Sequence, residues 1–218
     1  MDSNKNVLKY TFYYWGPFLF RTEIPMNLIN ELKDRGGKTK KSHHKNLAGN
    51  LNKQNTYTDD DKKWFHQAYA PAFQSYLDGF KRYHDKEHID ITGFDLQSLW
   101  INNMKAGDYN PRHVHTGDLS FVIFLDVPEK LEKENKKFEG KSSGPGSITF
   151  TYGESNRPFW ATSTRNIFPK TGEMYIFPAL LNHYVHPFKT KNVTRISVSG
   201  NVNFNVNDNR DRARYDII

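Results

Sequence analysis

The chain contains no cysteine among its 218 residues. Disulfide bonds and thiolate metal sites are therefore excluded, and any bound metal must use histidine, carboxylate or backbone ligands. No apolar run approaches the ~18 residues that a membrane-spanning helix needs. The first residues also lack the positive-then-apolar order of a signal peptide. We expect a soluble, cytoplasmic protein that forms one domain, because single domains reach about 250 residues.

Acidic residues are fewer than basic ones, 24 against 31, which gives a net charge of +7. Much of the excess lies in two stretches, Lys38–Lys45 and Lys130–Lys141. Charge runs of this kind are most often solvated loops. They can also form a docking surface for an acidic partner or for nucleic acid. The sequence leaves both interpretations open.

The N-terminal part combines one predicted strand with two predicted helices. The strand spans Leu8–Trp15, and a helix follows over Pro25–Lys33, where Gly36-Gly37 should end it. A second helix is expected over residues 58–84, because its apolar residues recur at helical spacing. Pro71 should bend or break that helix.

The part that follows is rich in short β-type segments separated by Gly, Pro and Asn, a pattern typical of a sandwich or barrel. With leading helices it predicts an α+β layout around a jelly roll. We therefore predict one domain with a supporting N-terminal part (1–92), a β-barrel core (93–206) and a charged tail (207–218). The expected strands are Leu96–Met104, Arg112–His115, Leu119–Val127, Gly146–Tyr152, Ala161–Ile167, Glu173–Pro178, His183–Pro187 and Arg195–Phe204.

Two histidines stand two residues apart, at His113 and His115. On a strand this spacing places both imidazoles on one face. A two-residue turn at Thr116-Gly117 would set Asp118 opposite His115, facing the same way. Three further side chains of the next strand would then line that face: Ser120, Val122 and Phe124.

A second histidine cluster follows about 70 residues later, with His183 and His186. A ring nitrogen from His183 could complete a three-point metal site with open positions for substrate and dioxygen, the geometry of non-haem Fe(II) oxygenases. His186 is the lesser candidate, because a step of three residues along a strand reverses the face. The remaining histidines are interpreted as surface residues: His43, His44, His66, His84 and His88.

Arg195 and Ser197 share a face of the last predicted strand. A buried arginine is unfavourable unless it meets an anion, and its planar fork suits a carboxylate. A dicarboxylate could bridge the metal and Arg195. The alternative is that Arg195 lies on the outer face and forms a surface ion pair.

From about Leu99 to Asn203 the chain resembles the prolyl-hydroxylase-like branch of the 2-oxoglutarate/Fe(II) oxygenases. It is similar to uncharacterised members encoded by bacterial and marine phage genomes. The order and spacing of five pieces carry the resemblance. They are Gly107–His115, Asp118–Pro128, Gly172–Pro178, His183–Pro187 and Arg195–Ser197.

The resemblance implies a double-stranded β-helix (jelly-roll, cupin-like) barrel. It implies that His113 and His183 bind iron and that Arg195 with Ser197 holds the distal carboxylate of 2-oxoglutarate. The implied reaction decarboxylates 2-oxoglutarate and hydroxylates a C–H bond of a peptidyl or amino-acid substrate. Fe(II), 2-oxoglutarate and dioxygen would be required, with ascorbate as an optional addition. The expected location is the cytoplasm of a bacterial or phage-infected cell.

The chain departs from the family pattern at two positions. The usual His-x-Asp/Glu motif has His115 at the place of the acid, so the third ligand is either His115, which we favour, or Asp118. In the first case Asp118 would lie behind His115 and orient its ring. Phe124 stands where relatives often carry a tyrosine that contacts the co-substrate, and Asn102 on the preceding strand could replace that contact.

Two other functions compete with the oxygenase. A three-His cupin-type metal dioxygenase that does not use 2-oxoglutarate would keep the histidines but gives no reason to bury Arg195 and Ser197. A non-catalytic basic module would bind nucleic acid or another partner through the lysine-rich stretches and use the barrel as a scaffold.

Overall fold

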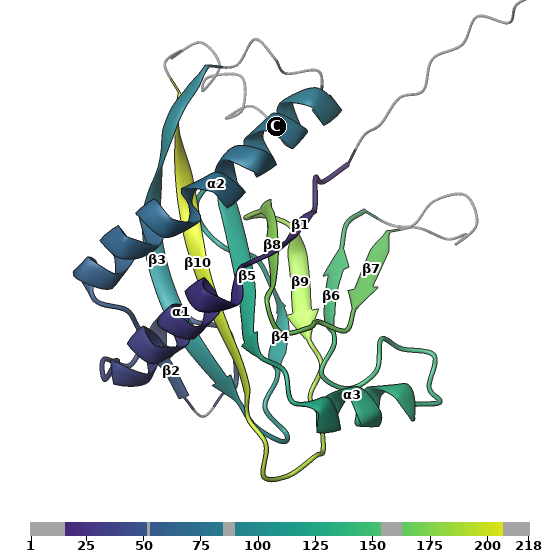
Figure 1. Cartoon of the computed structure of the whole chain (residues 1–218). Coiled ribbons are helices and arrows are strands. Elements are labelled where there is room, and N and C mark those ends of the chain that lie inside the picture. Colours follow the sequence, from purple (N-terminus) through teal and green to yellow (C-terminus); the bar gives the residue numbers. More distant parts are fainter. Residues whose placement is uncertain (1–15, 52, 85–89, 154–162, 207–218) are drawn as a thin grey trace, which may run out of the picture.

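The computed structural model describes residues 16–51, 53–84, 90–153 and 163–206, which form two antiparallel β-sheets with helices on one side (Figure 1). The large sheet has six strands in the order β1-β8-β5-β10-β3-β2, and the small sheet has four in the order β4-β9-β6-β7. The strands are β1 (Phe20–Glu23), β2 (Lys53–Thr56), β3 (Ile91–Met104), β4 (Asn110–His113), β5 (Leu119–Asp126), β6 (Ile148–Thr151), β7 (Thr164–Ile167), β8 (Glu173–Pro178), β9 (Asn182–Val185) and β10 (Arg195–Val206). From β3 onward the chain passes repeatedly between the sheets, so the predicted double-stranded β-helix is confirmed.

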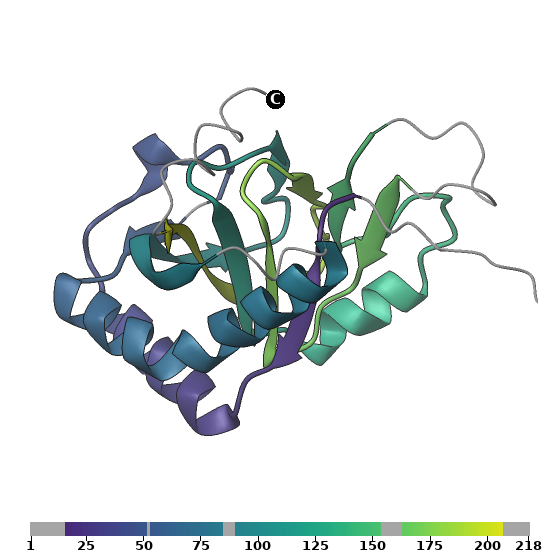
Figure 2. The ribbon, with the colours of Figure 1, turned by 90° about the horizontal axis from the view of Figure 1, so that it is seen from above.

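The helices α1 (Met26–Lys38) and α2 (Asp59–His84) lie along the outer face of the large sheet (Figure 2). The short helix α3 (Glu129–Lys136) lies at the other end of the barrel, and a 3-10 turn, η1, spans His44–Asn46 (Figure 1). None of the helices in the described residues is long and apolar enough to cross a membrane.

Strand β5 is buried on both faces, because its successive side chains enter two different cores. Phe121 and Ile123 point toward the helices and join the core beneath α1 and α2. Val122 and Phe124 point the other way, into the core between the two sheets. A continuous apolar run is therefore required, in place of the apolar-polar alternation of a half-exposed strand.

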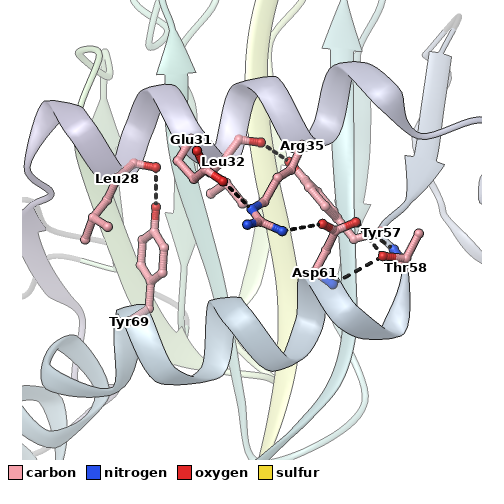
Figure 3. A network of polar contacts seen from close by, with 8 residues as sticks. All are labelled: Leu28, Glu31, Leu32, Arg35, Tyr57, Thr58, Asp61 and Tyr69. Carbon is pink, nitrogen blue, oxygen red and sulfur yellow. Dashed lines mark hydrogen bonds and ion pairs between the residues drawn. The ribbon is translucent and has the colours of Figure 1, made fainter.

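The two supporting helices are fastened to each other and to the sheet by polar contacts (Figure 3). The Tyr57 hydroxyl donates to the Leu32 carbonyl of α1 at 2.8 Å. Arg35 of α1 pairs with Asp61 of α2 at 3.0 Å and with Glu31 one turn earlier at 2.7 Å. Together these contacts hold α1 and α2 against the sheet that carries the site.

Two predicted helix boundaries were wrong. Helix α1 does not end at Gly36-Gly37 but continues to Lys38. Gly36 is buried, and a Cβ there would collide with the Tyr57 hydroxyl and the Ile101 side chain, so this glycine permits close packing. Pro71 does not break helix α2, because the helix's buried residues lie on both sides of the proline and hold it on the sheet.

The charged stretch after β5, expected as a solvated loop, contains α3. Ion pairs four residues apart support this helix, Lys133–Glu129 at 2.8 Å and Lys136–Glu132 at 2.7 Å, while Leu131 is buried beneath it. Alternating charge at a spacing of four was the sequence signal for it.

Other segment predictions also changed. The strands β1 and β2, which pair with β8 and β3, were not predicted. The predicted strand Leu8–Trp15, the start of Ala161–Ile167 and the tail from 207 lie outside the described residues.

Candidate metal centre

Three imidazoles meet at the open edge of the small sheet. Strands β4 and β9 pair so that His113 lies directly opposite His183, and His115 follows two residues after the end of β4. One ring nitrogen from each of the three lies within 4.8 Å of the others, and the Nε2 atoms of His115 and His183 are 3.2 Å apart. The predicted trio of His113, His115 and His183 is therefore brought together.

Backbone carbonyls orient two of the rings. The Nδ1 of His113 lies 2.7 Å from the Pro111 carbonyl, and the Nδ1 of His183 lies 2.8 Å from the Leu181 carbonyl. Because a carbonyl can only accept, each Nδ1 carries the proton and leaves the Nε2 lone pair free. This is the usual outer-shell arrangement of a metal-binding histidine.

The site keeps its imidazoles neutral. Burial, followed by the charges of His183 and His113, lowers the pKa of His115 to about 3. Burial, followed by the charge of His113, lowers the pKa of His183 to about 4. The pKa of His113 is lowered as well, again mainly by burial. Three unprotonated nitrogens facing one point are a suitable donor set for a divalent transition metal.

Arg195 is buried at the opposite end of the same cavity, with 4% of its surface exposed. Its Nη1 donates to the Gly146 carbonyl at 2.7 Å, while its Nε has no hydrogen-bond partner among the described residues. Burial lowers the pKa of Arg195 to about 10. The guanidinium carbon lies 5.5 Å from the centre of the Phe124 ring. Among the described residues no carboxylate pairs with Arg195, so the outer-face alternative is wrong and the cation can accommodate an anion.

The cavity between the two sheets measures about 90 Å³, and its walls include the other residues predicted to contact the co-substrate. Ser197 lies on the wall two residues beyond Arg195, and Asn102 faces it across the paired strands β10 and β3. The Asn102 amide accepts from Gln54 at 2.8 Å and donates to Ser199 at 3.3 Å. The predicted inward face of β5 is also present: Ser120, Val122 and Phe124 all line the cavity.

The predicted hairpin that would set Asp118 against His115 is wrong. Strands β4 and β5 belong to different sheets, so the chain at Gly117, with a φ of 93°, crosses between the sheets and does not fold back. Asp118 is exposed, and its carboxylate accepts the Phe204 amide at 2.7 Å. It therefore closes the end of the barrel and lies apart from the three histidines.

His186 lies away from the centre, as its spacing indicated. Its Nε2 is 2.9 Å from the Ser143 hydroxyl and 3.4 Å from that of Thr149.

Trp100 packs beside the three histidines and was not predicted from the sequence. Its ring lies 5.8 Å from that of His115 on one side and 5.5 Å from that of His43 on the other. Its position two residues before Asn102, on the same face of β3, was a usable signal. His43, expected at the surface, is instead half-buried against this ring.

Comparisons with known proteins agree with this geometry. Residues 98–201 match a family model described as "Putative 2OG-Fe(II) oxygenase". A search of curated protein sequences finds no match.

Several solved structures share the fold. A prolyl-4-hydroxylase from Pseudomonas putida has a TM-score of 0.51 at 13% identity, over 84% of this chain and 90% of that one. The viral collagen prolyl hydroxylase of Paramecium Bursaria Chlorella virus-1, solved as a 2-oxoglutarate complex, has 0.50 at 14%, over 86% and 96%. The protein OsALKBH1 has 0.52 at 11%, over 86% and 99%. At such identities the likeness concerns the fold alone. The family match over residues 98–201 and the three convergent histidines support a 2-oxoglutarate- and Fe(II)-dependent dioxygenase that uses dioxygen.

Proposed function

We propose that this chain hydroxylates a C–H bond of a peptidyl or amino-acid side chain, with Fe(II) held by His113, His115 and His183. The observation that carries the proposal is the pairing of two features in one cavity. Three unprotonated imidazole nitrogens converge at one end, and a buried guanidinium that has no counter-ion among the described residues lies at the other.

The three histidines would occupy one face of the metal and leave positions open. Bound Fe(II) would supply the activation of dioxygen that drives decarboxylation of 2-oxoglutarate and hydroxylation of the substrate. The protein supplies orientation, through the carbonyls that fix the two Nδ1 protons. All three ligands are neutral, so we expect weaker retention of Fe(II) than in the family's sites with a carboxylate ligand.

Arg195 and Ser197 are proposed to hold the distal carboxylate of 2-oxoglutarate. The unpartnered Nε of Arg195 gives the guanidinium a free donor for an anion. The pocket excludes most water, so a charge-assisted bond formed there is stronger than at the surface. Phe124 offers only its ring face, and the Asn102 amide is the neighbouring polar group.

Binding of Fe(II) and 2-oxoglutarate under anaerobic conditions tests the proposal. The wild type should give a weak visible charge-transfer band when both are present. Arg195→Met should weaken 2-oxoglutarate binding about 30- to several-thousand-fold, because truncation of a buried charge-assisted contact costs about 2–5 kcal/mol. His183→Ala should lose stoichiometric Fe(II). If the wild type binds Fe(II) but 2-oxoglutarate produces no band, the three-His dioxygenase that does not use 2-oxoglutarate becomes the better assignment.

A further inference from the structure

One wall of the catalytic cavity is formed by the segment 38–58, which joins α1 to α2 and contains β2. Leu47, Gly49, Leu51 and Gln54 of this segment all line the cavity. Backbone hydrogen bonds between Asn50 and Tyr109 fasten it beside the start of β4. The segment is therefore part of the entrance to the metal centre and not a detached loop.

The segment that supplies this wall carries charge of one sign only, on residues that flank the cavity lining. The segment contains five lysines and two histidines but no Asp, Glu or Arg. All five lysines are exposed, and no ion pair within the described residues involves any of them. They are Lys38, Lys40, Lys41, Lys45 and Lys53.

Some lysines elsewhere are neutralised locally. Those at the start of α2 pair with aspartates three residues earlier, and α3 contains two pairs at a spacing of four. Other exposed lysines form no ion pair within the described residues, so what distinguishes the segment 38–58 is that its sequence contains five lysines and no acidic residue. A cleft bordered by one sign of charge attracts the opposite charge and raises its local concentration.

One residue of the segment comes close to the three histidines, whereas its lysines lie outside the cavity lining, and Lys38, Lys40 and Lys41 border a neighbouring hollow. His43 of this segment packs against Trp100, which in turn packs against His115. Two exposed side chains lie beside this path: Val114 lines the cavity with 45% exposure, and Tyr109, which pairs with Asn50, is 41% exposed. An apolar residue of a bound chain could contact these side chains while its charged neighbours contact the lysines.

We propose that the substrate is an acidic polypeptide segment whose carboxylates lie along the 38–58 wall while the residue to be hydroxylated enters the cavity. This inference rests on the proposed function. A polypeptide fits better than nucleic acid, because single-stranded nucleic acids bind to grooves that combine cations with exposed aromatic rings. The segment has one aromatic side chain outside its histidines, Tyr57, and that ring is 2% exposed, so Tyr109 beside the segment offers a single exposed ring where successive bases would need several.

The test is fluorescence anisotropy with the full chain and three labelled probes: a (Glu-Gly) repeat peptide, a (Gln-Gly) repeat of equal length, and an oligothymidylate of equal net charge. The acidic peptide should bind most tightly, and its affinity should fall as salt is raised, since exposed charges are screened beyond about 8 Å at physiological ionic strength. Binding of this peptide should also perturb the visible band of the Fe(II)–2-oxoglutarate form.

A pair of charge-matched triple variants locates the site. Lys41→Glu/Lys45→Glu/Lys53→Glu should weaken binding of the acidic peptide about tenfold to a hundredfold, from three surface ion pairs lost and reversed. The control is a triple reversal of the same charge in and after α3, far from β2 in Figure 1, and it should change binding less than about threefold. The control positions are Lys130, Lys137 and Lys141. All six sites are exposed, so unfolding is not expected, and thermal melting checks it.

Two results would overturn the inference. If both triple variants weaken binding equally, the attraction reflects net charge and no site exists on this wall. If the oligothymidylate binds more tightly than the acidic peptide, the partner is a nucleic acid. Peptide binding needs neither metal nor 2-oxoglutarate. A wild type that binds the peptide but gives no visible band would thus contradict the proposed function alone.

Discussion

Asn135 of α3 is expected to control the affinity for 2-oxoglutarate without touching it. Its amide donates to the Pro145 carbonyl at 2.8 Å and to the Ser147 hydroxyl at 3.0 Å. These two residues flank Gly146, whose carbonyl accepts from Arg195 at 2.7 Å. Gly146 has a φ of 73°, which a side chain rarely adopts, so the turn has few other ways to present this carbonyl.

The expected loss of affinity follows from the hydrogen bond between Arg195 and the Gly146 carbonyl, which would weaken. A hydrogen bond to a charged group contributes about 1.5–3 kcal/mol. Asn135→Ala leaves Gly146 in place but frees the turn around it, so we expect roughly half of that contribution to be lost. About 1 kcal/mol corresponds to a roughly fivefold weaker binding of 2-oxoglutarate.

The assay is anaerobic titration of the Fe(II) protein with 2-oxoglutarate and, separately, with a 2-oxo acid that lacks the distal carboxylate. By the proposed assignment both ligands would bind the metal through the 2-oxo acid end that they share, and only the dicarboxylate would reach Arg195. Asn135→Ala should weaken the dicarboxylate selectively. Lys133→Ala, on the exposed side of the same helix, is the matched control and should change neither affinity.

Equal weakening of both ligands would refute the reasoning, since it would mean that Asn135 supports the barrel as a whole. An unchanged dicarboxylate affinity would also refute it, because the turn would then be held without this amide.

Two further predictions concern ligand charge and pH. His115→Asp should tighten Fe(II) binding, because a charged oxygen replaces a neutral nitrogen and recreates the family's His-x-Asp pattern. The measurement is an Fe(II) titration. Weaker binding would mean that the shorter side chain cannot reach the metal. Burial by itself would raise the pKa of Glu173, but hydrogen bonds from the Lys170 amide, the Arg21 guanidinium and the Tyr175 hydroxyl outweigh it, so the pKa lies below its ordinary value. This carboxylate therefore stabilises the fold above the ordinary Glu pKa of about 4.3, and the contribution is lost as the pH falls through the lowered value. Glu173→Gln should lower the melting temperature at pH 7, and the difference from the wild type should disappear once the pH falls below the lowered pKa of Glu173. A difference that persists in strong acid would show that the charge is not the cause.

Local periodicity was sufficient for much of this molecule. The spacing of His113 and His115 predicted that both rings face the same way, and they do come together, although β4 ends at His113. The spacing of Arg195 and Ser197 placed both side chains on the cavity wall. Strand β8 was predicted with its observed limits, because its apolar run lies between Gly172 and Pro178 and has no helical periodicity. These inferences needed only the order of neighbouring residues.

Local periodicity did not predict which segments lie next to one another in space. Asp118 looked like a partner of His115 because the intervening turn was taken for a hairpin, yet the chain crosses there to the other sheet. The residue that does face His113 is His183, 70 positions away and paired through β4 and β9. Such pairings are decided by which apolar faces can be buried together, and local sequence does not encode that choice.

The environment of Arg195 was likewise decided by tertiary structure. The sequence predicted that this arginine would need an anion if buried, but it left the face of the strand open. Only the packed barrel puts the guanidinium behind Phe124 and sets the Gly146 carbonyl, from a turn 49 residues earlier, against it. Composition and spacing thus determined which chemical groups the chain carries. Burial in a common cavity determined which of them act together, because only there are water and competing partners excluded.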